Sequence, residues 1–250
     1  YRDVNIDSYY GEAATVIDYP ISNTSWAAPK KSDADYRPAY SVDADGNEIY
    51  TDDMSAEEKY EAAKQAALGY LEAAGYTVEN GKVVKMSYEL MIGADGKGDH
   101  PSFGIIADAK RTLGEIGMEL IINDLSDAGQ LYDSMSAHST ELWAAAWAAD
   151  ADPDMYQTYY SNQPSNHYCI ADSTLDEIIM EARTSDDQNY RKPLYKQALD
   201  IIIDWGVEVP IYQRENCVVY SPQRVNADSF TKDSTPFYKW VKDIALIEMN

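Results

Sequence analysis

Three carboxylates at alternating positions follow an apolar run that contains two tryptophans. In the stretch ELWAAAWAADADPDMYQ, Asp150, Asp152 and Asp154 come shortly after Trp143 and Trp147. A carboxylate beside an apolar wall can hold a protonated amine, and two neighbouring carboxylates can act as acid and base in hydrolysis. The same residues also fit a buried strand that ends in a solvent-exposed turn. The surrounding elements decide between such a turn and a binding group at the mouth of a cleft.

A carboxylate-pair hydrolase, such as a glycosidase, is the enzymatic interpretation of this stretch. On an extended strand Asp150 and Asp152 would lie only about 7 Å apart, and Pro153 interrupts the run. No histidine lies in a G-x-S-x-G or H-E-x-x-H sequence, which weakens nucleophilic and zinc-dependent hydrolysis. The histidines are His100, His138 and His167. We interpret His167 as a half-buried structural histidine and expect no enzyme and no catalytic residue.

Two loops have the composition, but not the spacing, of ligand-binding motifs. SVDADGNEIYTDDM resembles a calcium loop that starts at Asp43, but an EF-hand requires glycine at its sixth position and glutamate at its twelfth. Glu48 and Met54 occupy those positions, so we interpret the loop as an Asp-Gly turn. The loop at residues 93–100, GADGKGDH, fits neither a phosphate-loop nor a dinucleotide-binding pattern. The sequence therefore predicts no metal site and no cofactor.

Charge and composition exclude several classes of partner. The chain has 250 residues, of which 43 are acidic and 20 are lysine or arginine, for a net charge of -23. Such a surface repels nucleic acid and anionic lipid. The longest apolar run, residues 142–149, is too short to span a bilayer. Cys169 and Cys217 form no C-x-x-C pair, which excludes a zinc motif but leaves open both one disulfide and two free buried thiols.

Periodic apolar residues predict alternating helices and strands after residue 54, whereas residues 1–54 are expected to be irregular. The first helix starts at a capping box formed by Ser55 and Glu58 and ends at Gly75. Helical and two-residue periods then predict a strand at 83–92, a helix at 101–117, a strand at 118–124, a helix at 128–136, a strand at 141–147 and helices at 173–184 and 189–206.

Strands and helices that alternate with short joints predict an α/β fold with parallel strands. Ligands of such sheets bind beyond the carboxyl ends of the strands, and Asp150 lies just past the expected end of its strand. Asp152 is expected to be the N-cap of a helix that opens at Pro153. Pro193 is expected in the first turn of the last helix, and Trp143 is expected to pack in the core.

The order and spacing of several segments resemble the C-terminal half of the family 5 extracytoplasmic solute-binding proteins of oligopeptide and dipeptide ABC importers. The segments are LEAAGY, LGEIGMEL, AAAWAADADPDMY, LDEIIMEART and LYKQALDIIIDWGVEVPIY, and the resemblance runs from about residue 5 to about residue 220. It implies an α/β lobe of a two-lobed periplasmic-binding-protein type II clamp, with a mixed sheet flanked by helices. Residues 1–215 would form the second, C-terminal ligand-binding lobe, and residues 216–250 would return toward the first lobe.

The W-x-x-D signature of that family falls on residues 147–150. The resemblance implies that Asp150 pairs with the α-amino group of a peptide, with Trp147 as its apolar neighbour. It also implies that backbone atoms of Ala146, Trp147 and Ala148 bond the peptide as an added strand. A charge-assisted hydrogen bond contributes about 1.5–3 kcal/mol, and main-chain bonding gives affinity without selecting side chains.

The function implied by the resemblance is capture of peptides by their α-amino end and delivery to the membrane permease of an ABC importer. The location would be extracytoplasmic, in a periplasm or as a cell-surface lipoprotein. The partners would be a peptide or other small solute, the permease and the missing N-terminal lobe. The polar opening YRDVNIDSYY holds no signal peptide, and we expect the chain to be a piece of a longer protein.

The sequence departs from the family in one respect. Some members place arginine or lysine near this strand to take the terminal carboxylate of the peptide, whereas residues 112–182 contain neither. Only His138 and His167 could carry positive charge there. The carboxylate end would then meet the missing lobe or water, and a sugar or another amine is an alternative ligand. A scaffold lobe without a small ligand is the third interpretation.

Overall fold

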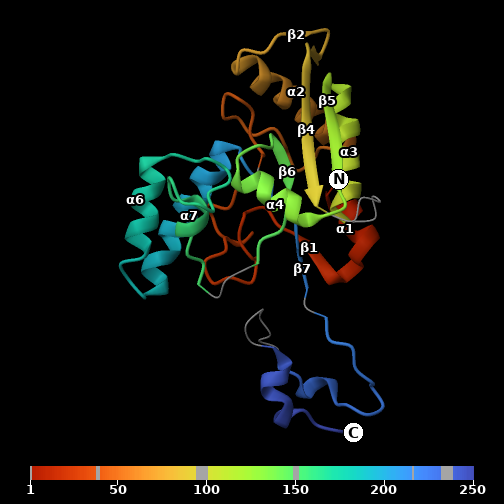
Figure 1. Cartoon of the computed structure of the whole chain (residues 1–250), viewed down its shortest axis with the longest axis vertical. Coiled ribbons are helices and arrows are strands. Elements are labelled where there is room, and N and C mark those ends of the chain that lie inside the picture. Colours follow the sequence, from red (N-terminus) through yellow and green to blue (C-terminus); the bar gives the residue numbers. More distant parts are fainter. Residues whose placement is uncertain (1, 38–39, 94–100, 149–151, 216, 232–238) are drawn as a thin grey trace. The chain divides into compact units, whose positions relative to one another are not determined.

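Helices and short strands alternate along the chain in the computed structural model (Figure 1). The structure describes residues 2–37, 40–93, 101–148, 152–215, 217–231 and 239–250. Its elements are α1 (Arg2–Tyr10), η1 (Gly11–Ala13), β1 (Ala14–Val16), α2 (Ala56–Ala73), β2 (Val78–Glu79), β3 (Lys82–Val83), β4 (Met86–Gly93), α3 (Pro101–Glu115), β5 (Met118–Leu125), α4 (Ala128–Ser136), β6 (Leu142–Ala144), α5 (Tyr156–Tyr159), α6 (Ser173–Ala182), α7 (Gln188–Trp205), β7 (Tyr212–Arg214), η2 (Ala227–Ser229) and η3 (Trp240–Leu246). The α/β class predicted from the sequence is confirmed.

The chain divides into two compact units. The first unit comprises residues 1–5 and 32–145, and the second comprises residues 6–31 and 146–250. The chain returns to the second unit directly after β6. The predicted ligand-binding residues therefore lie at the start of the second of its two segments, residues 146–250.

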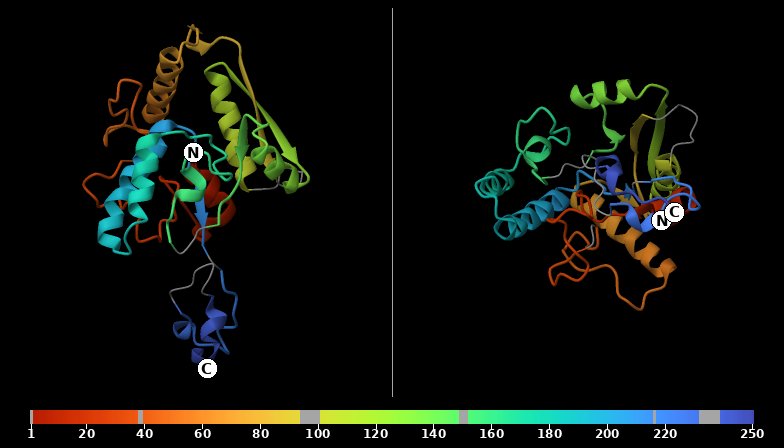
Figure 2. Two further views of the ribbon diagram at one scale, coloured as in Figure 1. Left: turned by 60° about the vertical axis from the view of Figure 1, so that its left-hand side comes forward. Right: turned by 90° about the horizontal axis from the view of Figure 1, so that it is seen from below.

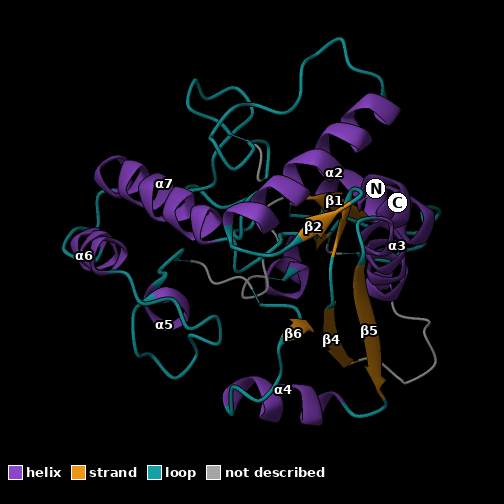
Figure 3. Ribbon diagram, turned by 90° about the horizontal axis from the view of Figure 1, so that it is seen from above, coloured by secondary structure: helices purple, strands orange, loops and turns teal. Residues whose placement is uncertain are grey.

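A parallel three-stranded sheet with the order β5-β4-β6 forms the centre of the first unit. Met86 pairs with Met118 at the start of β4 and β5, and Leu90 pairs with Leu142 of β6. The helix α3 comes between β4 and β5 in the chain and lies beside β5 (Figure 3). The predicted βαβ unit and its parallel strands are therefore confirmed. The antiparallel strands occur in separate two-stranded sheets, β1-β7 and β2-β3.

One face of this sheet packs on α3 because both elements place apolar residues at their own period. Ile92 of β4, Leu120 of β5 and Ile106 of α3 are buried together. Partly buried neighbours complete the cluster: Leu90, Leu113, Ile122, Leu142 and Ala144. Burying each such aliphatic side chain contributes about 1.5–3 kcal/mol, so this cluster is a main source of stability in the unit.

The predicted capping box at the start of α2 is present. The Glu58 backbone N–H donates to Ser55 Oγ at 3.3 Å, and the Ser55 N–H donates to Glu58 Oε2 at 2.8 Å. The helix ends before Gly75, whose φ of +89° is the left-handed conformation that glycine adopts without strain.

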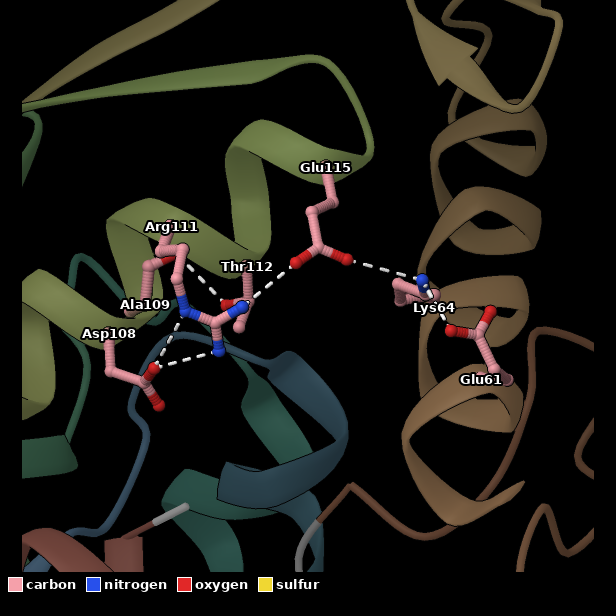
Figure 4. Close-up of polar contacts among 7 residues, drawn as sticks. All are labelled: Glu61, Lys64, Asp108, Ala109, Arg111, Thr112 and Glu115. Atoms are coloured by element: carbon pink, nitrogen blue, oxygen red, sulfur yellow. Dashed lines mark hydrogen bonds and ion pairs between the residues drawn. The ribbon is translucent and has the colours of Figure 1, made fainter. Parts of the chain in front are cut away.

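One ion pair joins α2 to α3, and each of its two residues has further pairs within its own helix (Figure 4). Lys64 Nζ lies 2.6 Å from Glu61 and 3.2 Å from Glu115 Oε2. Arg111 bonds the other oxygen of Glu115 at 2.9 Å and Asp108 at 2.9 Å. Exposed pairs of this kind are screened by salt and add little stability.

In the second unit α6 and α7 lie side by side, as both views of Figure 2 show. Their facing residues are almost fully buried: Leu175, Ile179, Ala182, Tyr195, Ala198, Leu199 and Ile202. Asp172 caps α6 by accepting from the backbone N–H groups of Thr174 and Leu175. Its second oxygen accepts from Trp205 Nε1 at 3.0 Å, which ties the start of α6 to the end of α7.

The N-terminal stretch is more ordered than predicted. Residues 1–54 were expected to be irregular, but they contain α1 and β1. β1 pairs antiparallel with β7, with Ala14 opposite Arg214. A three-residue strand shows no alternation of its own, and its partner lies far along the chain, so the local sequence carries no signal for it.

Two strands are shorter than predicted. The strand expected at 83–92 begins only at Met86, because Lys85 has a φ of +58° and interrupts the extended backbone. Val84 is consequently outside the strand and 39% exposed. The strand expected at 141–147 ends at Ala144, so the segment that follows it is not part of a sheet.

The predicted places of two prolines in helices were also wrong. No helix opens at Pro153, since α5 begins at Tyr156 with Met155 before it. Pro193 is the sixth residue of α7 rather than a first-turn residue, because the helix already starts at Gln188 behind the N-cap Asp187. The Asp43 loop is the predicted turn, with the Asp43 carboxylate accepting from nearby backbone N–H groups.

Cys169 and Cys217 are both exposed and form no disulfide with each other. Neither the disulfide nor the burial considered for them from the sequence is found. Among the residues described, no helix is both long and apolar enough to cross a membrane.

Candidate functional site

The three residues that follow β6, at the start of the segment 146–250 of the second unit, are exposed. Ala146, Trp147 and Ala148 follow β6 directly, and the Trp147 side chain is 47% exposed. In the described part of the chain, no backbone–backbone hydrogen bond involves these residues. Their N–H and C=O groups are open to an extended partner. The predicted anchor Asp150 lies outside the described residues, so its role stays a prediction.

The Trp147 side chain is held by two neighbours although half of it is exposed. Its Nε1–H donates to the Tyr168 hydroxyl at 2.9 Å. Its ring stacks on the His167 imidazole, with 5.9 Å between ring centroids and 10° between planes. One edge and one face of the indole are therefore occupied within the unit. The half-buried position expected for His167 is confirmed, and its partner is the tryptophan of the predicted site.

The loop between α5 and α6, which carries His167 and Tyr168, is held by hydrogen bonds from one buried side chain. Asn166, only 5% exposed, donates from Nδ2 to the carbonyls of Tyr160 at 3.2 Å and Ile170 at 2.9 Å. Its Oδ1 accepts from the Ile170 N–H at 3.3 Å. One buried side chain thus closes the loop on both sides of His167 and Tyr168 and fixes where they lie.

Behind this loop lies the half-buried carboxyl group of Glu208, which has two tyrosine partners. The Tyr159 hydroxyl donates to Glu208 Oε2 at 2.8 Å, and Tyr168 also hydrogen-bonds Glu208. The rings of Tyr159 and Tyr168 stack at 5.4 Å with 10° between planes. Burial raises the pKa of Glu208, and the two hydroxyl bonds act in the opposite direction by stabilising the carboxylate. Burial and the nearby Glu208 charge also raise the pKa of both tyrosines.

Asp152 has a structural role, but not the predicted one. Its two oxygens accept from Arg191 Nη1 at 2.8 Å and Nη2 at 2.7 Å. The guanidinium lies over the rings of Trp26 and Tyr195, at 5.4 and 5.2 Å from their centroids, and the Arg191 side chain is 9% exposed. The bonds from Arg191 lower the pKa of Asp152. The predicted N-cap role was wrong because no helix begins at Pro153; the Asp152 carboxylate instead pairs with the Arg191 guanidinium.

Asp154 is also occupied within the unit. Its Oδ1 accepts from the Tyr156 backbone N–H at 3.1 Å, and its Oδ2 lies 3.5 Å from Arg183 Nε. The Arg183 guanidinium lies over the Tyr156 ring at 4.2 Å. Since arginines hold both Asp152 and Asp154 as ion pairs, their arrangement favours a structural role over an acid–base pair.

The sequence named the exposed segment but missed the residues that support it. Glu208 lies between Val207 and Val209 in VEVP, and Val209 is 59% exposed, so the local sequence does not indicate that the Glu208 carboxyl is covered. Arg191 precedes Tyr195 by one helical turn and therefore shares the apolar face of α7, where a charge needs a partner. Asn166 gave no such signal, because SNQPSNHY has the composition of an ordinary loop.

Comparison with solved structures defines the class of the fold. No protein-family model and no curated protein sequence matches the chain. Solved structures of solute-binding proteins do share its fold. The chain is similar to the oligopeptide-binding protein AppA from Bacillus subtilis, solved with a nonapeptide, at a TM-score of 0.62 and 17% identity over 85% of this chain and 39% of that one.

Two further structures show the same likeness. The nickel ABC transporter structure from Bacillus halodurans has a TM-score of 0.63 and 21% identity, over 91% of this chain and 43% of that one. The periplasmic binding protein DppA from Helicobacter pylori, solved with the peptide STSA, has a TM-score of 0.61 and 18% identity, over 96% and 41%. The chain thus spans about two-fifths of these proteins. Its fold is that of part of an ABC-transporter solute-binding protein, which confirms the resemblance at the level of the fold.

Proposed function

We propose that the chain is part of an extracytoplasmic solute-binding protein that captures peptides by their α-amino end and delivers them to the membrane permease of an ABC importer. The observation that carries the proposal is the exposed segment Ala146–Ala148, whose backbone groups lie open beside a fixed tryptophan. It occurs on a fold shared with proteins solved with bound peptides.

The segment suits an extended ligand in two ways. Alanine side chains at 146 and 148 leave the backbone accessible, so a peptide can add its own N–H and C=O groups as a strand. Trp147 between them provides an apolar surface for a ligand side chain. Asp150 follows two residues after Ala148, at a distance along the chain that allows it to meet the first amino group of a peptide bonded there.

The rest of the clamp is also part of the proposal. Residues 1–215 would belong to the second ligand-binding lobe and residues 216–250 would lead toward a first lobe. That lobe would complete the site and supply what residues 112–182 lack, a cation for the carboxylate end of the peptide. Attachment as a cell-surface lipoprotein is one way to hold such a protein near its permease.

The experiment compares free and blocked peptide amines. Binding of trialanine and N-acetyl-trialanine to the full-length protein is measured by titration calorimetry, with Asp150→Asn as the test variant. Because a charge-assisted hydrogen bond is lost, we expect binding of trialanine to weaken about 10- to 100-fold, and the acetylated peptide to bind weakly even to the parent. Asp186→Asn, the same change at an exposed position, is the matched control.

Equal affinity for the free and acetylated peptides would refute amine capture. A sugar or a different amine is the alternative ligand, favoured by the absence of lysine and arginine from residues 112–182. Mass spectrometry of the solute that co-purifies with the protein distinguishes it from a peptide.

A further inference from the structure

Three side chains form a continuous hydrogen-bonded path from the exposed segment into the interior of the second unit. Trp147 Nε1 bonds the Tyr168 hydroxyl at 2.9 Å, and Tyr168 bonds Glu208. Tyr159 bonds the same carboxyl group at 2.8 Å without contacting Trp147 through any hydrogen bond of the described residues. Both tyrosines therefore hydrogen-bond Glu208, but only Tyr168 hydrogen-bonds Trp147.

The chemistry of these groups fixes the direction of each bond. An indole N–H can only donate, and an ionised carboxylate can only accept. The Tyr168 hydroxyl must therefore accept from Trp147 and donate to Glu208. A hydroxyl oriented by a carboxylate presents its lone pairs to the indole, so Glu208 determines the geometry that Trp147 meets.

Burying an acid is costly, and a neutral side chain would avoid the cost. Glu208 has two hydroxyl donors, and the indole at the other end of the path is 47% exposed. A path that only stabilised the interior would not need to end on an exposed ring. The ring it ends on is the one beside the open backbone of Ala146 and Ala148.

We propose that Tyr168, oriented by Glu208, is a positioning residue that sets the plane of the Trp147 indole against the ligand. His167 covers one face of the ring, and the other face is left for a side chain of the ligand. The position of that face sets which ligand side chains fit. The inference rests on the proposed function, because it takes Trp147 as a ligand contact.

The first experiment uses no ligand. The indole Nε1–H signal of Trp147 is identified by its loss in Trp147→Ala, and its hydrogen exchange is measured by NMR. We expect Tyr168→Phe to shift this signal and to speed its exchange about three- to tenfold, since one hydrogen bond is lost. Tyr159→Phe is the comparison variant, because it removes a hydroxyl that bonds Glu208 and Tyr168 but removes no hydrogen bond of the indole itself. An indole signal that Tyr168→Phe does not change would overturn the proposal.

The second experiment is a double-mutant cycle on trialanine binding in the full-length protein. Tyr168→Phe is expected to weaken binding about three- to tenfold in the parent and to have no effect in the Trp147→Ala background, while the surface control Asp186→Asn leaves binding unchanged. Equal losses in both backgrounds would show that Tyr168 does not act through Trp147. If Trp147→Ala itself leaves binding unchanged, the proposed ligand site fails, whereas the NMR result still decides whether Tyr168 orients the ring.

Discussion

The ion pair between Asp152 and Arg191 should be strongly asymmetric in its effect on stability. Both side chains take part in the same two hydrogen bonds, but Arg191 is 9% exposed and Asp152 is 55% exposed. Removal of the Asp152 carboxylate leaves the Arg191 guanidinium buried without its counter-ion. Removal of the guanidinium leaves a carboxylate that water can reach. The same contact should therefore cost different amounts depending on which partner is changed.

The magnitudes follow from burial. Breaking a buried pair by removing one partner costs about 3–5 kcal/mol. Asp152→Asn retains one acceptor and the acid was only partly desolvated, so we expect a loss of about 2–3 kcal/mol in the free energy of unfolding. Arg191→Met keeps an apolar stem against Trp26 and Tyr195 and loses the cation–π contacts, each about 0.5–2 kcal/mol when partly desolvated. We expect Arg191→Met to cost about 1–2 kcal/mol.

The assay is urea unfolding followed by circular dichroism and tryptophan fluorescence, with Asp186→Asn as a surface control expected within about 0.5 kcal/mol of the parent. The double variant should be about as stable as Arg191→Met alone, because no buried charge remains to be stranded. A larger loss for Arg191→Met than for Asp152→Asn, or a double variant that loses the full sum, would contradict this reasoning.

Two further predictions concern the residues behind Trp147. Burial raises the folded-state pKa of Glu208, so the folded protein keeps the carboxyl proton to a higher pH than the unfolded chain does. The free energy of unfolding therefore falls as the pH rises from the unfolded-state pKa of Glu208 through its folded-state pKa. Glu208→Gln should remove this part of the pH dependence of the melting temperature between pH 4 and pH 8. Asn166→Ala removes three hydrogen bonds and should lower the free energy of unfolding by about 1–3 kcal/mol. It should also broaden the Trp147 indole signal, whereas Ser165→Ala, in the same loop, should not.

The parts of the fold that a local sequence could predict are those with a full period of apolar residues or a complete cap. The capping box at Ser55 and the βαβ unit from β4 to β5 were confirmed because each is determined by neighbouring residues. The strand β1 was missed because three residues carry no period and its partner is β7. The end of β6 at Ala144 was missed because alanine and tryptophan fit a strand and an open segment equally well.

The same limit applies to the candidate site. The exposed segment could be found from its W-x-x-D pattern, but the side chains that orient its tryptophan come from two other places in the sequence. Tyr168 belongs to a loop and Glu208 follows α7, so only the folded chain shows that they meet. Asp152 was assigned to a helix cap because its partner, Arg191, lies 39 residues further along the chain.

The pairing of β1 with β7 affects the order in which the chain can fold. The second unit is made of residues 6–31 and 146–250, and residues 32–145 of the first unit are inserted between them. During synthesis β1 cannot pair with β7 until Arg214 has been added to the chain. The parallel sheet, by contrast, has all of its strands once Ala144 has left the ribosome. Closing so long a loop carries an entropic cost that grows slowly with its length and slows the step. The inserted segment can therefore be structured early, and the unit that carries Trp147 is completed late.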